Sequence, residues 1–416
     1  MRIDGQRLWD SLMELAQIGG TEKGGVCRIA LTALDGQGRD LVCRWLREAG
    51  CEVRVDDIGN IFGRRPGTED LPAVATGSHI DTQPTGGKFD GNYGVLAGLE
   101  VVRTLNDHNV KTRAPIEVCA WTNEEGTRFT PVMMGSGTWA GVFKSEDMWV
   151  RPDLEGKTVG QELAAIGYSG TVPAGPSAGY PAFGSYFEAH IEQGPVLEDA
   201  DITIGVVLGA LGQRWFDVEV TGMEAHAGPT PMPLRLDALL ATARLIEAVN
   251  RIALSEAPYG RGTVGFMQVH PNSRNVIPGR VKTTVDLRHL DAAGLERMQA
   301  ALYAAAEEIA GGTRTRLGGI KIDIKLATQF PPCAFEGECV SAVRNAAAAL
   351  ELPTLELVSG AGHDAVYVAR KCPAAMIFVP CKDGISHNEV EDARQDHIEA
   401  GGNVLLHAML ARAGRV

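Results

Sequence analysis

Apolar and polar positions along the chain alternate between two periods, one typical of helices and one typical of strands. Residues 36–49 carry apolar side chains at helical spacing and stop at Gly50, a residue type that commonly ends a helix. The pattern then predicts, in order, strands at 51–55, 60–64 and 72–77, a helix from about Tyr93 to Leu105, and a buried strand from Pro115 to Trp121. Strands that alternate with helices predict an α/β fold with a largely parallel central sheet.

A second unit is predicted to begin near Gly212. Its elements follow the order β-α-β-β-α-β: strand 214–221, helix 236–251, strands 263–269 and 281–290, helix 294–309, and strand 320–326. After Pro332 the first pattern resumes with helix 339–350, strand 355–358, helix 363–370 and strand 374–379. We therefore predict one domain made of residues 1–211 and 330–416, and a smaller α+β domain, residues 212–329, inserted into it.

Charge and composition narrow the partners that this chain can have. The formal net charge of −13 disfavours nucleic acid and anionic membranes. No run of 18 apolar residues is present, and the first residues lack the apolar core of a signal peptide. Eight cysteines form no CxxC pair, which is typical of reduced, packed thiols. These features together predict a cytoplasmic protein.

Polar residues that could bind metal follow the predicted strands. His79 and Asp81 come directly after the first apolar strand, and Asp90 lies in a glycine-rich turn that opens a helix. Asp90 could also act as a helix cap, and both roles can hold at once. Glu124 and Glu125 follow the strand that ends at Trp121. Two adjacent carboxylates in that place repel each other unless a cation lies between or beside them.

Two further clusters extend the pattern. Around residue 190, strand-like alternation places Glu188, His190 and Glu192 on one face. His387 follows the last β run. Each residue alone has an ordinary structural explanation, but five such clusters after apolar strands indicate a metal site at the carboxyl edge of the sheet. Nitrogen and oxygen ligands without thiolate suit Zn, Mn, Co or Ni.

Seven motifs occur in the order seen in a known family. They are GSHIDT (77–82), GGKFDGNYGV (86–95), TNEEGTRF (122–129), HIEQGPVLE (190–198), AHAGPTPM (225–232), SGAGHDA (359–365) and SHNE (386–389). As a set they resemble the amidase, hydantoinase and carbamoylase branch of the M20 metallopeptidase-like hydrolases, over nearly the whole chain. The resemblance implies that the first domain is catalytic and binds two divalent ions.

The resemblance also assigns roles to the polar residues of the first domain. It implies that one ion is held by His79 and His190, the other by Glu125 and His387, that Asp90 bridges them, that Asp81 orients His79, and that Glu124 is the general base. Related peptidases usually carry a carboxylate where this chain has His190. This histidine therefore favours a carbamoylase over a peptidase. His363 and Asp364 are interpreted as the start of a helix.

The inserted domain is implied to act as a lid and to form a homodimer. A histidine matching His226 helps to polarise the scissile carbonyl in the family, and Asn275 matches a substrate contact. Arg288 resembles a clamp for the substrate carboxylate, a task suited to a planar guanidinium. Gln193 resembles the residue that hydrogen-bonds the ureido group. Arg288 could instead be a surface arginine, and Asn275 could only support the turn before Pro278.

The predicted reaction removes the carbamoyl group from an N-carbamoyl amino acid, giving the amino acid, ammonia and carbon dioxide. The substrate can be an N-carbamoyl-L-amino acid or N-carbamoyl-β-alanine, because the sequence does not distinguish them. Hydrolysis of allantoate or ureidoglycolate is an alternative with the same chemistry. A peptidase of the wider superfamily is a second alternative. A non-catalytic binding protein would need a broken ligand or a missing base, whereas every expected position is filled.

Overall fold

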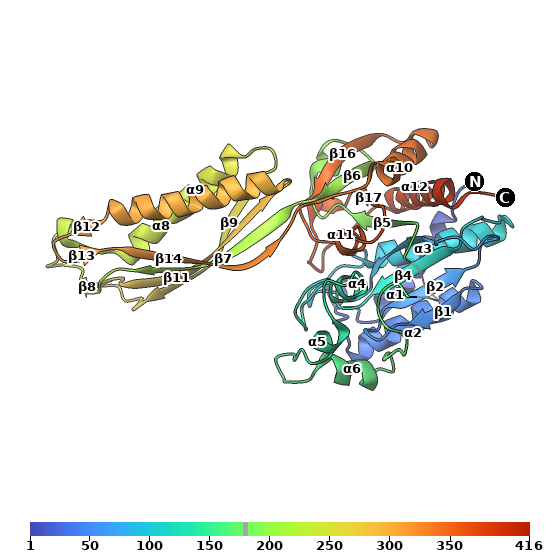
Figure 1. The fold of residues 1–416 in the computed structure, drawn as a ribbon, viewed down its shortest axis with the longest axis horizontal. Coiled ribbons are helices and arrows are strands. Elements are labelled where there is room, and N and C mark those ends of the chain that lie inside the picture. The colour runs from blue at the N-terminus through green and yellow to red at the C-terminus, as the bar shows by residue number, and fades with distance from the viewer. Residues whose placement is uncertain (178–181) are drawn as a thin grey trace. The chain divides into compact units, whose positions relative to one another are not determined.

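The computed structural model covers the chain in two compact units and describes residues 1–177 and 182–416. The first unit comprises residues 1–209 and 334–416, and the second comprises residues 210–333 (Figure 1). The boundaries predicted from sequence were 212 and 329. Within the described residues, no helix combines the length and the apolar character needed to cross a membrane.

A nine-stranded mixed sheet organises the first unit. Its strands lie in the order β1 (Glu52–Val55), β2 (Ile61–Arg65), β4 (Ile116–Trp121), β3 (Val74–His79), β5 (Ser185–Ile191), β17 (Ala374–Val379), β6 (Ile204–Ala210) and β15 (Cys333–Ala334), with β16 (Thr354–Ser359) paired to β6. The four central strands β4, β3, β5 and β17 are parallel to one another. β2 and β6 flank them in antiparallel pairing. The predicted α/β class with a parallel centre is confirmed.

Helices cover both faces of the central strands. Those of the first unit are α1 (Gly5–Gln17), α2 (Ala33–Glu48), α3 (Asn92–Asp107), α4 (Met134–Trp139), α5 (Ser145–Trp149), α6 (Val159–Ala165), α7 (Val196–Asp199), α10 (Gly337–Ala349), α11 (Asp364–Val368) and α12 (Gln395–Ala413). Every residue of β3, β4, β5 and β17 is buried, so neither face of these strands is open to solvent. Continuous apolar runs such as 374–379 are the expected sequence of such strands.

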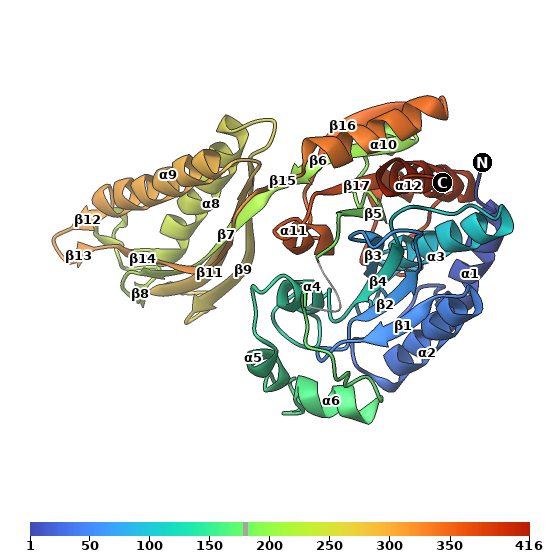
Figure 2. The ribbon, with the colours of Figure 1, turned by 45° about the vertical axis from the view of Figure 1, so that its right-hand side comes forward.

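The second unit is an antiparallel sheet with two helices on it. Its main elements are β7 (Gly212–Thr221), α8 (Ala238–Ser255), β9 (Arg261–His270), β11 (Arg280–His289), α9 (Ala292–Gly311) and β14 (Lys321–Phe330), and the sheet order is β14-β7-β11-β9. α8 and α9 lie side by side on one face, as Figure 1 and Figure 2 both show. Alternate residues of β7, among them Phe216, Val218 and Val220, are buried under these helices.

Short elements complete the second unit. They are β8 (Ala225–His226), paired with β10 (Val276–Ile277), and β12 (Arg314–Thr315), paired with β13 (Gly318–Gly319). β8 and β10 lie within the connections that flank α8 and β11. Their pairing brings the AHAGPTPM segment next to the segment around Asn275, because Val276 lies opposite His226.

Candidate metal centre and active site

The carboxyl ends of four adjacent parallel strands supply the polar residues of the candidate site. His79 is the last residue of β3, and His190 is the penultimate residue of β5. The loops after β3, β4 and β17 supply Asp90, Glu124, Glu125 and His387. Because parallel neighbours end at the same edge of a sheet, segments that are far apart in sequence meet there.

Asp90 lies at the centre of this cluster. Its Oδ1 is 3.2 Å from Nε2 of His190 and 3.9 Å from Nε2 of His79. Its Oδ2 is 3.2 Å from Nε2 of His387, which in turn is 3.4 Å from Oε2 of Glu125. Two groups of metal-binding atoms therefore share Asp90: His79 with His190, and Glu125 with His387.

The two buried histidines are oriented by backbone carbonyl groups. Nδ1 of His79 lies 2.9 Å from the carbonyl oxygen of Asp81, and Nδ1 of His190 lies 2.8 Å from that of Ile191. A carbonyl oxygen can only accept a hydrogen bond, so each Nδ1 carries a proton. Nε2 of each ring faces Asp90, and in the neutral ring it is the nitrogen left free to bind a metal ion. The backbone N–H of Gly91 donates to Nε2 of His190 at 3.3 Å, consistent with this tautomer.

Asp81 contacts His79 through its backbone. Its backbone oxygen, and not its carboxylate, is the hydrogen-bond partner of His79; the nearest carboxylate oxygen lies 3.9 Å away. The carboxylate instead accepts hydrogen bonds from the backbone N–H groups of Glu124 and Glu125, both at 3.3 Å. Asp81 thus ties the loop after β4 to the loop after β3. Sequence could not separate these contacts, because both use the same residue.

Glu124 and Glu125 differ in their surroundings. Glu125 accepts a hydrogen bond from Nε2 of Gln83 at 2.7 Å and belongs to the group with His387. Glu124 belongs to neither group, and its Oε2 lies 3.5 Å from Nε2 of His79. Burial, followed by the charge of Asp364, raises the pKa of Glu124 well above its usual range. Burial, followed by the charge of Asp90, raises the pKa of Glu125 to about 8.

The charge balance of the cluster fits divalent cations. Asp81, Asp90, Glu124 and Glu125 are carboxylates with little or no exposure to solvent. Burial alone would lower the pKa of His190, but its hydrogen bond with Asp90 outweighs burial and raises that pKa to about 9. Burial lowers the pKa of His79, by contrast, to about 4. The nitrogen and oxygen donors present match Zn, Mn, Co or Ni, and no thiolate is among them.

Gln193 and Glu192 follow β5 and lie outside the two groups. Nε2 of Gln193 donates to Oδ2 of Asp90 at 3.0 Å, so this amide contacts the shared carboxylate. The prediction that Glu188, His190 and Glu192 share one strand face is wrong for Glu192, because β5 ends at Ile191. The carboxylate of Glu192 instead accepts the backbone N–H groups of residues 196 and 197, at the start of α7.

His363 lies at the site although sequence placed it only at a helix start. Its buried ring is 4.6 Å from the ring of His190, measured between centroids, and its Nε2 lies 2.8 Å from Oγ of Ser359. Together with Glu188, which accepts a hydrogen bond from Ser78 at 2.7 Å, His190 and His363 form a third group of potential metal-binding atoms. The SGAGHDA motif was the available signal, since it too follows a strand.

Of the three predicted site residues of the second unit, His226 lies on β8 and Arg288 on β11, and Asn275 directly precedes β10. His226 is exposed, and its Nδ1 accepts the backbone N–H of Gly228 at 3.0 Å. The backbone oxygen of Asn275 accepts a hydrogen bond from Ala227 at 2.8 Å, next to His226. Arg288 lies on β11 and forms a two-point ion pair with Asp286, with Nη2 at 2.8 Å and Nε at 3.0 Å from Oδ2.

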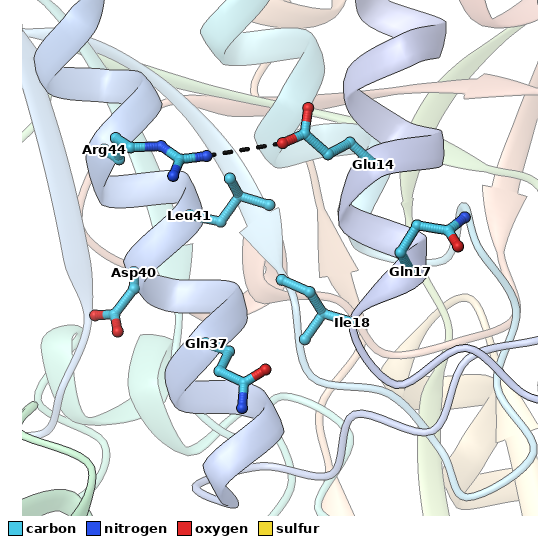
Figure 3. Close-up of a pocket in the computed structure, with 7 residues that line it drawn as sticks. All are labelled: Glu14, Gln17, Ile18, Gln37, Asp40, Leu41 and Arg44. Carbon is cyan, nitrogen blue, oxygen red and sulfur yellow. Dashed lines mark ion pairs between the residues drawn. The ribbon is translucent and has the colours of Figure 1, made fainter.

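A groove between α1 and α2 involves none of these residues (Figure 3). It is lined by Glu14, Gln17, Ile18, Gln37, Asp40, Leu41 and Arg44. Leu41 and Ile18 lie between the helices, and Arg44 reaches toward Glu14 at 3.7 Å. No group of metal-binding atoms overlaps this lining among the described residues.

Comparison with known proteins points to one family. The model of peptidase family M20/M25/M40 matches residues 75–411. An N-carbamoyl-L-amino-acid amidohydrolase of Rhizobium meliloti is 48% identical over 413 residues, covering 99% of this chain and 97% of that protein. A ureidoglycolate hydrolase of Arabidopsis thaliana is 34% identical over 97% of this chain and 86% of its own length.

Solved structures agree with this result. An amidase of the hydantoinase/carbamoylase family from Burkholderia multivorans is 58% identical, with a TM-score of 0.94 over 99% of this chain and 98% of that chain. The aminopeptidase PepT from Bacillus cereus shares the fold at a TM-score of 0.66 but only 18% identity.

Proposed function

Because the chain belongs to peptidase family M20/M25/M40, we propose that it removes the carbamoyl group from N-carbamoyl-L-amino acids. Members of this family are metal-dependent hydrolases, and this chain is a hydrolase of amide-type C–N bonds. The observation that carries the proposed substrate is the 48% identity, along practically the whole chain, to an amidohydrolase of that specificity.

We assign the first metal ion to His79 and His190, the second to Glu125 and His387, and both to Asp90. This assignment is supported by the carboxylate of Asp90, whose Oδ1 lies near His190 and whose Oδ2 lies near His387. When bound, divalent ions polarise the scissile carbonyl and lower the pKa of a nearby water. The buried carboxylates supply the negative charge that two cations require.

Glu124 is the proposed general base. It is buried beside His79 and belongs to neither ligand group, so its carboxylate is available to move a proton. Glu124 takes a proton from water as the water oxygen bonds to the ureido carbon, and it passes that proton to the leaving amino nitrogen. The C–N bond then breaks, releasing the amino acid and carbamate, which decomposes to ammonia and carbon dioxide.

The substrate contacts remain proposals from family resemblance. Arg288 would bind the substrate carboxylate, His226 would donate to the carbonyl oxygen, and Asn275 and Gln193 would hydrogen-bond the polar groups. Nε and Nη2 of Arg288 both donate to Oδ2 of Asp286, so a substrate carboxylate would share this guanidinium with Asp286 or replace it. The second unit would also form the homodimer contact.

Hydrolysis of ureidoglycolate or allantoate is the second candidate function. The ureidoglycolate hydrolase of Arabidopsis thaliana, at 34% identity, favours it. Both substrates carry a carboxylate and a ureido-type C–N bond, so the same residues would serve. The lower identity makes this the weaker candidate.

Ammonia release by the purified protein tests both functions. The protein is stripped of metal, reloaded with Mn, Zn, Co or Ni, and given N-carbamoyl-L-amino acids, N-carbamoyl-β-alanine, allantoate, ureidoglycolate and a dipeptide. Metal-dependent release from the N-carbamoyl-L-amino acids is expected. Cleavage of only allantoate or ureidoglycolate would support the second candidate function instead of the first. Cleavage of the dipeptide alone, which releases no ammonia and is followed by its new free amine, would contradict both.

A further inference from the structure

Glu391 is a buried glutamate that contacts two loops of the candidate metal centre. Only 3% of its surface is exposed. Its Oε1 accepts hydrogen bonds from the backbone N–H groups of Phe89 at 3.0 Å and Asp90 at 3.1 Å, across about 300 residues of sequence. The carboxylate therefore holds the backbone of the very residue whose side chain is shared between the two groups of potential ligands.

The second oxygen of Glu391 contacts the loop that carries His387. Oε2 lies 2.9 Å from Oγ of Ser386, the residue before His387. The same Oγ lies 3.1 Å from Oδ2 of Asp90. Ser386 has one hydroxyl proton, so it is shared between the carboxylates of Asp90 and Glu391. One side chain thus connects the loops that supply Asp90 and His387.

Packing leaves this position little freedom. A β-carbon on Gly87 would lie 2.0 Å from Cδ and Oε1 of Glu391, so the absence of a side chain at Gly87 makes the room that the glutamate fills. An aspartate at 391 would be one methylene shorter and could not reach both sets of partners. The side chain of Glu391 is therefore tightly packed and shielded from solvent.

We propose that Glu391 is a positioning residue that sets the distance between Asp90 and His387 and so determines the affinity for the metal ion between them. This inference rests on the proposed metal sites but not on the identity of the substrate. Partners of this kind, which hold a ligand in place without touching the metal, commonly change affinity 10- to 100-fold when removed.

Metal titration of the substrate-free protein tests the inference. Metal-stripped wild type, Glu391→Ala, Glu391→Gln and Glu389→Gln are titrated with Mn²⁺ by calorimetry. Glu389 is the matched control, because it lies two positions away, pairs with Lys23, and belongs to none of the groups of potential metal ligands among the described residues. Glu391→Ala is expected to weaken Mn²⁺ binding at least about tenfold. Glu391→Gln should stay within about threefold of wild type, since its amide oxygen can accept both N–H groups and its NH₂ can donate to Ser386.

Several outcomes would overturn the proposal. Mn²⁺ affinity of Glu391→Ala within threefold of wild type would remove the positioning role. An equal loss in Glu391→Gln would show that negative charge, and not position, matters. If Glu391→Ala does not fold, Ser386→Ala replaces it, and unchanged Mn²⁺ affinity of that variant overturns the proposal. Wild type that binds Mn²⁺ as expected but releases no ammonia would contradict the proposed function and leave this inference standing.

Discussion

Gly91 lies directly against the imidazole ring of His79. A β-carbon on Gly91 would come within 2.5 Å of three ring atoms, Cε1, Nε2 and Nδ1. The backbone φ of Gly91 is 67°, a value that residues other than glycine adopt only with strain. Glycine at this position therefore allows both the turn after Asp90 and the place of the ring.

Gly91→Ala is expected to displace the ring of His79 and weaken Mn²⁺ binding at least about tenfold. The measurement is Mn²⁺ titration of the metal-stripped variant, with activity as a second readout. Gly50→Ala is the matched control, because Gly50 has a φ of 79° and nothing within 4 Å of the added β-carbon. It carries the strain of roughly 1–2 kcal/mol without the clash. If Gly50→Ala weakened Mn²⁺ binding as much as Gly91→Ala does, the loss could not be assigned to the clash with His79.

Glu124→Gln is expected to lower kcat at least roughly 100-fold while leaving the bound metal in place, because an amide cannot take up the proton of water. Glu125→Gln is expected to lose metal instead, since this residue lies with Asp90 and His387. The checks are turnover of an N-carbamoyl-L-amino acid and metal content by elemental analysis. Loss of metal from Glu124→Gln with retention in Glu125→Gln would reverse the two roles.

Arg288→Ala is expected to raise KM roughly 10- to 100-fold with a smaller change in kcat, because a hydrogen-bonded ion pair to the substrate carboxylate contributes about 1.5–3 kcal/mol. The measurement is steady-state kinetics with an N-carbamoyl-L-amino acid and with its carboxamide. The variant and the wild type should differ little on the carboxamide, which lacks the charge.

Arg261→Ala provides the control for Arg288. Arg261 lies opposite Arg288 in the register of β9 and β11, and it donates to the backbone oxygens of Pro258 and Gly260. The KM of the Arg261→Ala variant should match that of wild type. A KM for Arg288→Ala that rises equally on both substrates would argue against carboxylate recognition.

Removal of metal by a chelator is expected to lower thermal stability. Free metal at 100 times its Kd stabilises the folded state by about 2.7 kcal/mol, which corresponds to roughly 4 °C in Tm for a unit the size of residues 1–209 with 334–416. The physical reason is the return of repulsion among Asp81, Asp90, Glu124 and Glu125. Calorimetric melting with and without chelator measures the effect. Asp90→Asn should melt at the same temperature in both conditions, and a chelator effect that persists in this variant would place the stabilising metal elsewhere.

The pattern of apolar and polar residues predicted the strands and helices that carry the site, because this pattern reflects which face of each element is buried. Buried parallel strands need continuous apolar runs, so 374–379 and the run ending at Trp121 were identified from sequence. The helical period predicted α2 and α3 to within a few residues. The helices α1 and α12 were not predicted from sequence, although the structure contains both.

The sequence by itself determined the fold class and which residue types follow the strand ends. Both depend on the periodicity of apolar residues and on the order of the elements, which can be read directly from the sequence. Only the tertiary structure decided how those residues meet. The backbone carbonyl of Asp81 orients His79, the ring of His363 packs on His190, and Glu391 holds the N–H of Asp90. Such contacts join residues up to 301 positions apart and depend on side-chain rotation and backbone direction, which no local pattern encodes.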